Sequence, residues 1–209
     1  MLQFETFPVG PLACTCILAW DAAEGRGVVV DPGGEADLIL KRVAAKGFQV
    51  EAILLTHGHF DHLGAAHELQ ALWDVPVHLH PEDAFLLEKL ELQTGLLGLP
   101  VVPAPCTSPM VEGQTLYGLT VIHTPGHTPG GCCLLGDSER GPVLLAGDTL
   151  FQGGVGRTDL WGGHWEALER SILEKLYVLP DATRVYPGHG PSTTLGEEAE
   201  GNPYVRRRG

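Results

Sequence analysis

Six consecutive residues, His57-Gly58-His59-Phe60-Asp61-His62, place three imidazoles and a carboxylate almost side by side in this sequence. The run follows an apolar segment, 51–56, that has the pattern of a buried strand, and it leads into a segment, 62–73, with helical spacing. Imidazole nitrogens and carboxylate oxygens are ligands for zinc and iron, and a loop at a strand end can turn several short ligands toward one point. The run therefore predicts a metal site, and the fold must bring further ligands to it.

Three later segments share this setting, because each places one candidate ligand beside glycine at the end of an apolar strand. A single histidine or aspartate beside glycine is more often a turn residue than a ligand. One short loop cannot surround a metal ion by itself, so ligands from distant strands are needed to complete the coordination shell. The three later segments can supply these ligands to the first run. The residues predicted to converge are His57, His59, Asp61, His62, His127, Asp148 and His189.

Both halves of the chain alternate between strand and helix patterns. The predicted strands are 2–7, 13–20, 28–31, 51–56, 75–80, 114–117, 119–123, 132–135, 143–146 and 184–186, and the predicted helices are 36–46, 62–73, 81–90 and 165–176. Each sheet must bury one face and each helix its apolar stripe, so the two halves stack most simply as helix, sheet, sheet and helix. With 209 residues, we expect one α/β domain spanning 1–209.

The segment 91–110 is rich in leucine, glycine and proline and shows no periodicity. This composition predicts a long irregular loop. Because long loops without secondary structure often cover sites, we expect this one to overhang the metal ligands.

Composition and charge exclude several classes of protein. The formal net charge is −13, and only the tail Arg206, Arg207 and Arg208 is locally basic, which argues against a nucleic-acid partner. No segment approaches the ~20 apolar residues of a membrane helix, and residues 1–8 lack the pattern of a signal peptide. The 5 cysteines are odd in number and sparse, which favours the reducing cytoplasm. We expect Cys14, Cys16, Cys132 and Cys133 to be buried free thiols.

The motifs of this sequence resemble those of the metallo-β-lactamase superfamily, and within it those of the glyoxalase II enzymes, or hydroxyacylglutathione hydrolases. The resemblance extends from Asp31-Pro32-Gly33-Gly34 through HGHFDH to GDTLFQGGVGRTD and the terminal PGHGPSTTLG. It implies a four-layer αββα sandwich with the site at one edge, between the sheets. It also implies that His57, His59 and His127 hold one metal, that Asp61, His62 and His189 hold a second, and that Asp148 bridges the two.

Departures from the family pattern narrow the implied function. Full-length glyoxalase II enzymes carry a C-terminal helical domain that contributes to the glutathione site, whereas only 20 residues follow His189 here. The chain resembles the short glyoxalase II-like bacterial proteins, which lack that domain and end in a tail similar to Asn202-Pro203-Tyr204. True β-lactamases of the fold typically carry cysteine at the position of Asp148, so the aspartate disfavours an antibiotic hydrolase.

The resemblance implies a hydrolase with two divalent metal ions, zinc or iron or both, with manganese as a further candidate. The expected substrate is a small-molecule thioester such as S-D-lactoylglutathione, and the expected nucleophile is a hydroxide that bridges the metals. Asp61 and Asp148 are the predicted catalytic residues. The oligomeric state is not indicated by the sequence.

Two interpretations stay open at this stage. Arg157, in the segment GGVGRTD, offers a planar fork for a substrate carboxylate, but a structural contact between Arg157 and Asp159 explains it equally well. The GRTD motif also resembles the persulfide dioxygenases, oxidoreductases of the same fold that use a single iron, here held by His57, His127 and Asp148.

Overall fold

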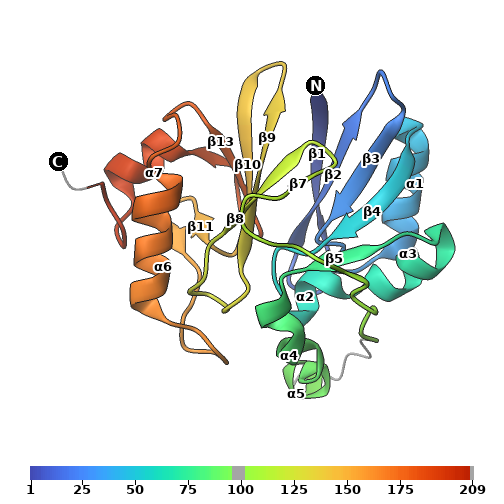
Figure 1. Cartoon of the computed structure of the whole chain (residues 1–209), viewed down its shortest axis with the longest axis horizontal. Helices are drawn as coiled ribbons and strands as arrows, with labels where there is room; N and C mark the ends of the chain where they lie inside the picture. The colour runs from blue at the N-terminus through green and yellow to red at the C-terminus, as the bar shows by residue number, and fades with distance from the viewer. Residues whose placement is uncertain (96–101, 208–209) are drawn as a thin grey trace.

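The computed structural model describes residues 1–95 and 102–207, and its centre is a pair of facing β-sheets (Figure 1). The strands of the first sheet lie in the order β1 (Leu2–Val9), β2 (Cys14–Asp21), β3 (Arg26–Val30), β4 (Gln49–Leu54), β5 (Val77–Leu79) and β6 (Ser108–Pro109). The strands of the second lie in the order β14 (Thr193–Thr194), β13 (Arg184–Pro187), β10 (Gly141–Gly147), β9 (Cys132–Ser138), β8 (Leu119–His123) and β7 (Thr115–Leu116). A small hairpin joins β11 (Leu150–Phe151) to β12 (Gly154–Val155).

Helices cover the outer face of each sheet. α1 (Ala36–Lys46) and α3 (Ala66–Trp73) lie along the outer face of the first sheet, whereas α2 (Phe60–Leu63), α4 (Ala84–Leu87) and α5 (Leu90–Gly95) lie below the ends of its strands in Figure 1. The 3-10 helix η1 (Pro81–Asp83) precedes α4. Along the second lie α6 (Trp165–Ser171), its π-helical continuation η2 (Ile172–Leu176) and α7 (Leu195–Gly201). The order helix, sheet, sheet and helix confirms the predicted αββα architecture.

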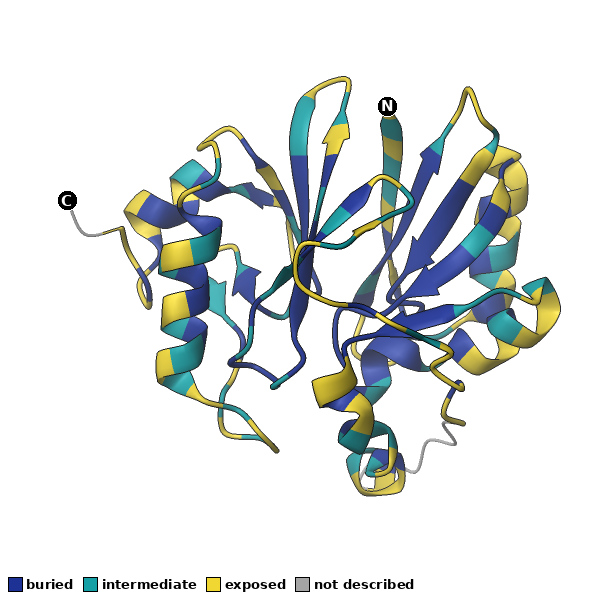
Figure 2. Ribbon diagram, viewed as in Figure 1, coloured by how far each residue is buried: buried dark blue, intermediate teal, exposed yellow. Residues whose placement is uncertain are grey.

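Each sheet buries both faces, which explains the long apolar runs in its central strands. Alternate residues of β4 point to opposite sides: Ile53 packs in the cluster beneath α1 and α3, whereas Leu54 packs between the sheets. Leu134 and Leu145 of the second sheet meet Leu54 in that inner cluster. Figure 2 shows the buried strands enclosed by helices whose outer faces are exposed.

Three predicted elements differ in the structure. The helix predicted over 81–90 is divided into η1, α4 and the start of α5. The helix predicted over 62–73 is divided into α2 and α3, because the Ala65 N–H donates to the Pro32 carbonyl at 2.8 Å and so leaves the helical pattern. The loop predicted over 91–110 is wrong at its start, where α5 continues to Gly95, and near its end, where β6 forms over Ser108–Pro109. Residues 96–101 of that prediction lie outside the described part of the chain.

Among the described residues, no helix is long and apolar enough to cross a membrane. Cys14, Cys16, Cys132 and Cys133 are buried free thiols, as predicted, whereas Cys106 is exposed.

Truncation of the inner core should be costly. Leu134 is completely buried between the sheets, so Leu134→Ala should lower the free energy of unfolding by about 2–5 kcal/mol, because it removes apolar contacts and leaves a cavity. Leu72 on α3 is 59% exposed, and Leu72→Ala should change the value by less than about 0.5 kcal/mol. Urea denaturation of both variants measures the difference, and similar losses would contradict the assignment of Leu134 to the core.

Candidate metal centre

Four loops and the short helix α2 bring the predicted ligands together at one edge of the sandwich. The loop between β4 and α2 carries His57 and His59, α2 carries Asp61 and His62, and the loop after β8 carries His127. Asp148 directly follows β10, and His189 follows β13. Because β4 belongs to the first sheet and the other three strands to the second, the candidate site lies where the two sheets meet. The structure thus places all seven predicted residues in one cluster of three ligand groups.

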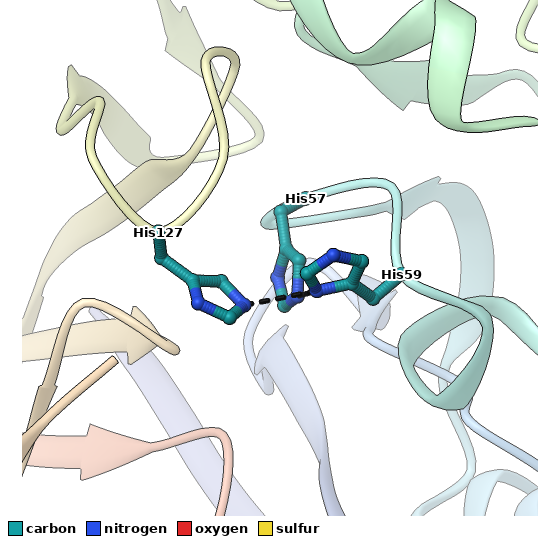
Figure 3. A group of neighbouring side chains, drawn as sticks. All are labelled: His57, His59 and His127. Carbon is teal, nitrogen blue, oxygen red and sulfur yellow. Dashed lines mark hydrogen bonds between the residues drawn. The ribbon is translucent and has the colours of Figure 1, made fainter. Parts of the chain in front are cut away.

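Three histidines form the first group (Figure 3). His59 Nδ1 lies 3.0 Å from His57 Nε2 and 2.9 Å from His127 Nε2. Nitrogens that bind one tetrahedral ion at 2.0–2.1 Å lie about 3.3 Å apart. The distances between these three ring nitrogens are therefore close to those expected of three ligands on one metal ion.

Asp61, His62 and His189 form a second group. Asp61 Oδ2 lies 3.1 Å from His189 Nε2 and 3.8 Å from His62 Nε2. All three residues come from loops or a short helix at the same edge as the first group.

Asp148 lies between the two groups and offers one oxygen to each. Its Oδ1 lies 3.3 Å from His62 Nε2 and 3.8 Å from His189 Nε2, whereas its Oδ2 lies 3.6 Å from His127 Nε2. A carboxylate in this position is arranged to bridge two cations.

Buried atoms without partners test whether these residues fit metal ions. Among the described side chains, His62 Nε2 and Asp148 Oδ1 are buried and have no hydrogen-bond partner. Leaving such atoms unsatisfied costs about 1–3 kcal/mol each or more for charged groups. A divalent ion bound between imidazole and carboxylate would satisfy both, so the donor set fits a metal pair.

A buried carboxylate orients one of the ligands. Asp31, which follows β3, accepts hydrogen bonds from His62 Nδ1 at 2.9 Å, Thr56 Oγ1 at 2.6 Å and Thr56 N at 2.8 Å. The bond to Nδ1 leaves Nε2 of His62 directed at the site, as is typical of metal-binding histidines. Sequence analysis quoted Asp31 only within a family motif and assigned it no role, because nothing near it in the sequence marks it as a partner of His62.

The two groups differ in their electrostatics. Burial lowers the pKa of His57 well below the usual 6.5 and that of His59 to about 3. In the second group, the hydrogen bond with Asp61 raises the pKa of His189. Burial alone would lower the pKa of His62, but acidic neighbours, Cys14 and Asp31 first among them, raise it well above 6.5. His57 and His59 are thus neutral over a wider range of pH than His62 and His189.

The loop after β12 supports His127 through its backbone. His127 Nδ1 donates to the Arg157 carbonyl at 2.7 Å. The Arg157 guanidinium pairs with Asp159 through two contacts of 2.7 and 2.8 Å, so the structural contact considered for this residue is formed. The Arg157 side chain is nevertheless 60% exposed.

The remaining histidines lie outside the seven-residue cluster. His80 and His123 stack on each other with ring centroids 4.0 Å apart, and His164 caps α6 by accepting from the Ala167 N–H. His78 is buried on β5.

The comparisons with known proteins agree with this geometry. The family model described as the metallo-β-lactamase superfamily matches residues 9–189. The hydroxyacylglutathione hydrolase GloC of Haemophilus influenzae is 37% identical, over 99% of this chain and 100% of that protein. The crystal structure of the BLEG-1 B3 metallo-β-lactamase is 36% identical with a TM-score of 0.89, over 97% of this chain and 99% of that one. TTHA1623, solved in a di-iron-bound form, is 42% identical with a TM-score of 0.88, over 96% and 100%.

The chain belongs to the metallo-β-lactamase superfamily. Membership, together with the clustered histidines and aspartates, supports a metal-dependent enzyme of the metallo-hydrolase type with a dinuclear site.

Protons and metal should compete differently at the two groups. Metal ligation requires neutral imidazole, so a ligand with a raised pKa gives up its metal at a higher pH. We therefore expect acidification from pH 8 to pH 5 to release metal first from the group of Asp61, His62 and His189, because the pKa values of both its histidines are raised.

Two variants isolate the groups for this measurement. His59→Ala should retain the second metal position, and His189→Ala should retain the first. Zinc per chain after dialysis at each pH should give a release midpoint about one pH unit or more higher for His59→Ala. Equal midpoints, or the reverse order, would contradict the electrostatic difference between the groups.

Proposed function

We propose that this protein is a metal-dependent hydrolase of small-molecule thioesters, such as S-D-lactoylglutathione, and that it works with two divalent ions. Zinc and iron suit the ligand set, and manganese is a further candidate. The observation that carries the proposal is the position of Asp148, whose two oxygens face two separate ligand groups. His57, His59 and His127 would hold one ion, Asp61, His62 and His189 the other, and Asp148 would bridge them.

The bound ions supply an activated water and a Lewis acid for the substrate carbonyl. The protein's own residues then have simpler tasks. Asp61 is 7% exposed and lies 3.1 Å from His189, and its carboxylate can accept a hydrogen bond from the attacking water and orient it. Asp148 holds the two halves of the site in register. A thiolate leaves readily, so the reaction needs no strong general acid from the protein.

One named relative supports a thioester substrate, and another supplies the main competing substrate. GloC is a hydroxyacylglutathione hydrolase by name, and this chain matches it from end to end. BLEG-1 is named a B3 metallo-β-lactamase at similar identity, so a β-lactam is the natural competing substrate in any assay. Asp148, in place of the cysteine typical of true β-lactamases, favours the thioester.

Metal analysis with an assay on S-D-lactoylglutathione tests the proposal. We expect two metal ions per chain, thioester hydrolysis that a chelator abolishes and added metal restores, and weak or no β-lactam hydrolysis. Asp148→Ala should lower kcat/KM at least about 100-fold and reduce metal content, since the bridging group is lost. Asp137→Ala, at an exposed position on β9, is the control and should retain both.

The competing interpretations give different results in the same experiment. A single iron per chain with oxygen uptake on a persulfide would instead indicate a dioxygenase-like oxidoreductase. Wild-type thioesterase activity in Asp148→Ala would overturn the assigned site.

Arg157 is proposed to bind a carboxylate of the substrate, as glutathione carries. The guanidinium is exposed and planar, and its contact with Asp159 must be exchanged for the substrate. Arg157→Ala should therefore raise KM about 3- to 10-fold and change kcat less than about 2-fold. Asp159→Ala, which frees the guanidinium, should not raise KM. An unchanged KM in Arg157→Ala would contradict a role in substrate binding and would indicate that Arg157 serves only to pair with Asp159.

A further inference from the structure

We propose that Asp83 is a positioning residue that sets the metal affinity of the three-histidine group without touching the metal. Asp83 is the last residue of η1, the short helix that follows β5, and its side chain is completely buried. This inference rests on the proposed function only in treating His57, His59 and His127 as one metal position.

The Asp83 carboxylate ties together the two loops that carry these histidines. Its Oδ2 accepts from the Gly58 N–H at 2.9 Å and from the Thr128 hydroxyl at 2.7 Å. Its Oδ1 accepts from the Gly130 N–H at 2.6 Å. Gly58 lies between His57 and His59, and Thr128 directly follows His127, so every donor adjoins a member of the group or lies in the same loop.

The two loops come from different sheets, and Asp83 spans the seam between them. The loop with Gly58 leaves β4 of the first sheet, whereas the loop with Thr128 and Gly130 leaves β8 of the second. A single carboxylate that accepts from both therefore fixes the distance from His127 to the other two imidazoles.

The glycines around Asp83 are matched to it. A Cβ at Gly130 would lie 2.8 Å from the Asp83 carboxyl carbon, and a Cβ at Gly58 would lie 3.1 Å from the Asp83 carbonyl oxygen. At Gly130 a side chain would clash with the Asp83 carboxylate, whereas at Gly58 it would also press against Leu86, whose Cβ would lie 3.0 Å away. Glycine at position 130 therefore lets the backbone N–H reach the carboxylate.

The second metal group is supported by a different carboxylate, since Asp31 binds His62 directly. Among the hydrogen bonds of the described residues, none joins Asp83 to Asp61, His62 or His189. The two positions consequently have separate supports, and a change at Asp83 should weaken one position only.

Asp83→Asn tests this, because it keeps the size of the side chain and replaces one acceptor oxygen by a donor. In the His189→Ala background, which leaves the three-histidine position, we expect Asp83→Asn to raise the Kd for zinc about 10- to 100-fold. In the His59→Ala background, which leaves the other position, the Kd should change less than about 2-fold. Zinc affinity is measured by chelator competition, with circular dichroism to confirm the fold.

Glu198→Gln is the matched control. Glu198 is also a buried carboxylate that accepts from a glycine N–H and a threonine hydroxyl, those of Gly153 and Thr193, but it adjoins no ligand. It should leave both zinc affinities unchanged. If Asp83→Asn does not fold, Thr128→Val, which removes one donor and keeps the shape, should give a smaller loss restricted to the same position.

The possible failures can be told apart. Equal weakening of both positions by Asp83→Asn, or the same loss in Glu198→Gln, would show that Asp83 is merely structural and would overturn the inference. If His59→Ala and His189→Ala each bind zinc as the wild type does, the metal assignment itself fails, whatever Asp83 does.

Discussion

Close approach between acidic and imidazole side chains at the seam of the two sheets is the interaction on which this structure depends. Asp148 lies within 3.3–3.8 Å of three imidazoles that reach it from two sheets. Such an arrangement needs glycine at the positions that pack against Asp148. A Cβ at Gly188 would overlap Asp148 Oδ1, and a Cβ at Gly156 would overlap the Asp148 carbonyl oxygen. The glycines that flank the ligands are therefore part of the site.

Buried polar groups of this kind are costly unless they are paired, and the fold supplies the pairs from outside the ligand set. Asp31 holds His62 and the strand-end residue Thr56, and Asp83 holds the loops around His57 and His127. Gln93 of α5 adds a third contact by accepting from the Phe60 N–H at 3.0 Å. Asp31, Asp83 and Gln93 thus each hold a different part of the HGHFDH segment. These contacts explain how a short segment outside the sheets can hold its side chains in a fixed arrangement.

The candidate ligand residues could be predicted from the sequence because each lies in a recognisable local sequence pattern. Four are contiguous in HGHFDH, and His127, Asp148 and His189 each stand beside glycine at the end of an apolar strand. The supporting residues lie in no such pattern. Asp83 follows Pro81 and Glu82 in what reads as an ordinary helix start, and its partners lie 25 to 47 residues away. A single acidic residue whose partners are distant backbone groups has no pattern that periodicity or spacing can reveal.

The positions of the longer strands and the αββα layering were predictable for a related reason, since apolar periodicity records which face of each element is buried. Periodicity does not record where a tertiary hydrogen bond interrupts an element. The apolar spacing of 62–73 continues through Gly64, yet the Ala65 N–H bonds the Pro32 carbonyl, and a Cβ at Gly64 would overlap the Gly33 carbonyl. The interruption leaves α2 as a short helix of its own, and this helix presents Asp61 and His62 to the site. The sequence pattern predicts α2 and α3 as one helix, yet α2 is the part that carries two residues of the site.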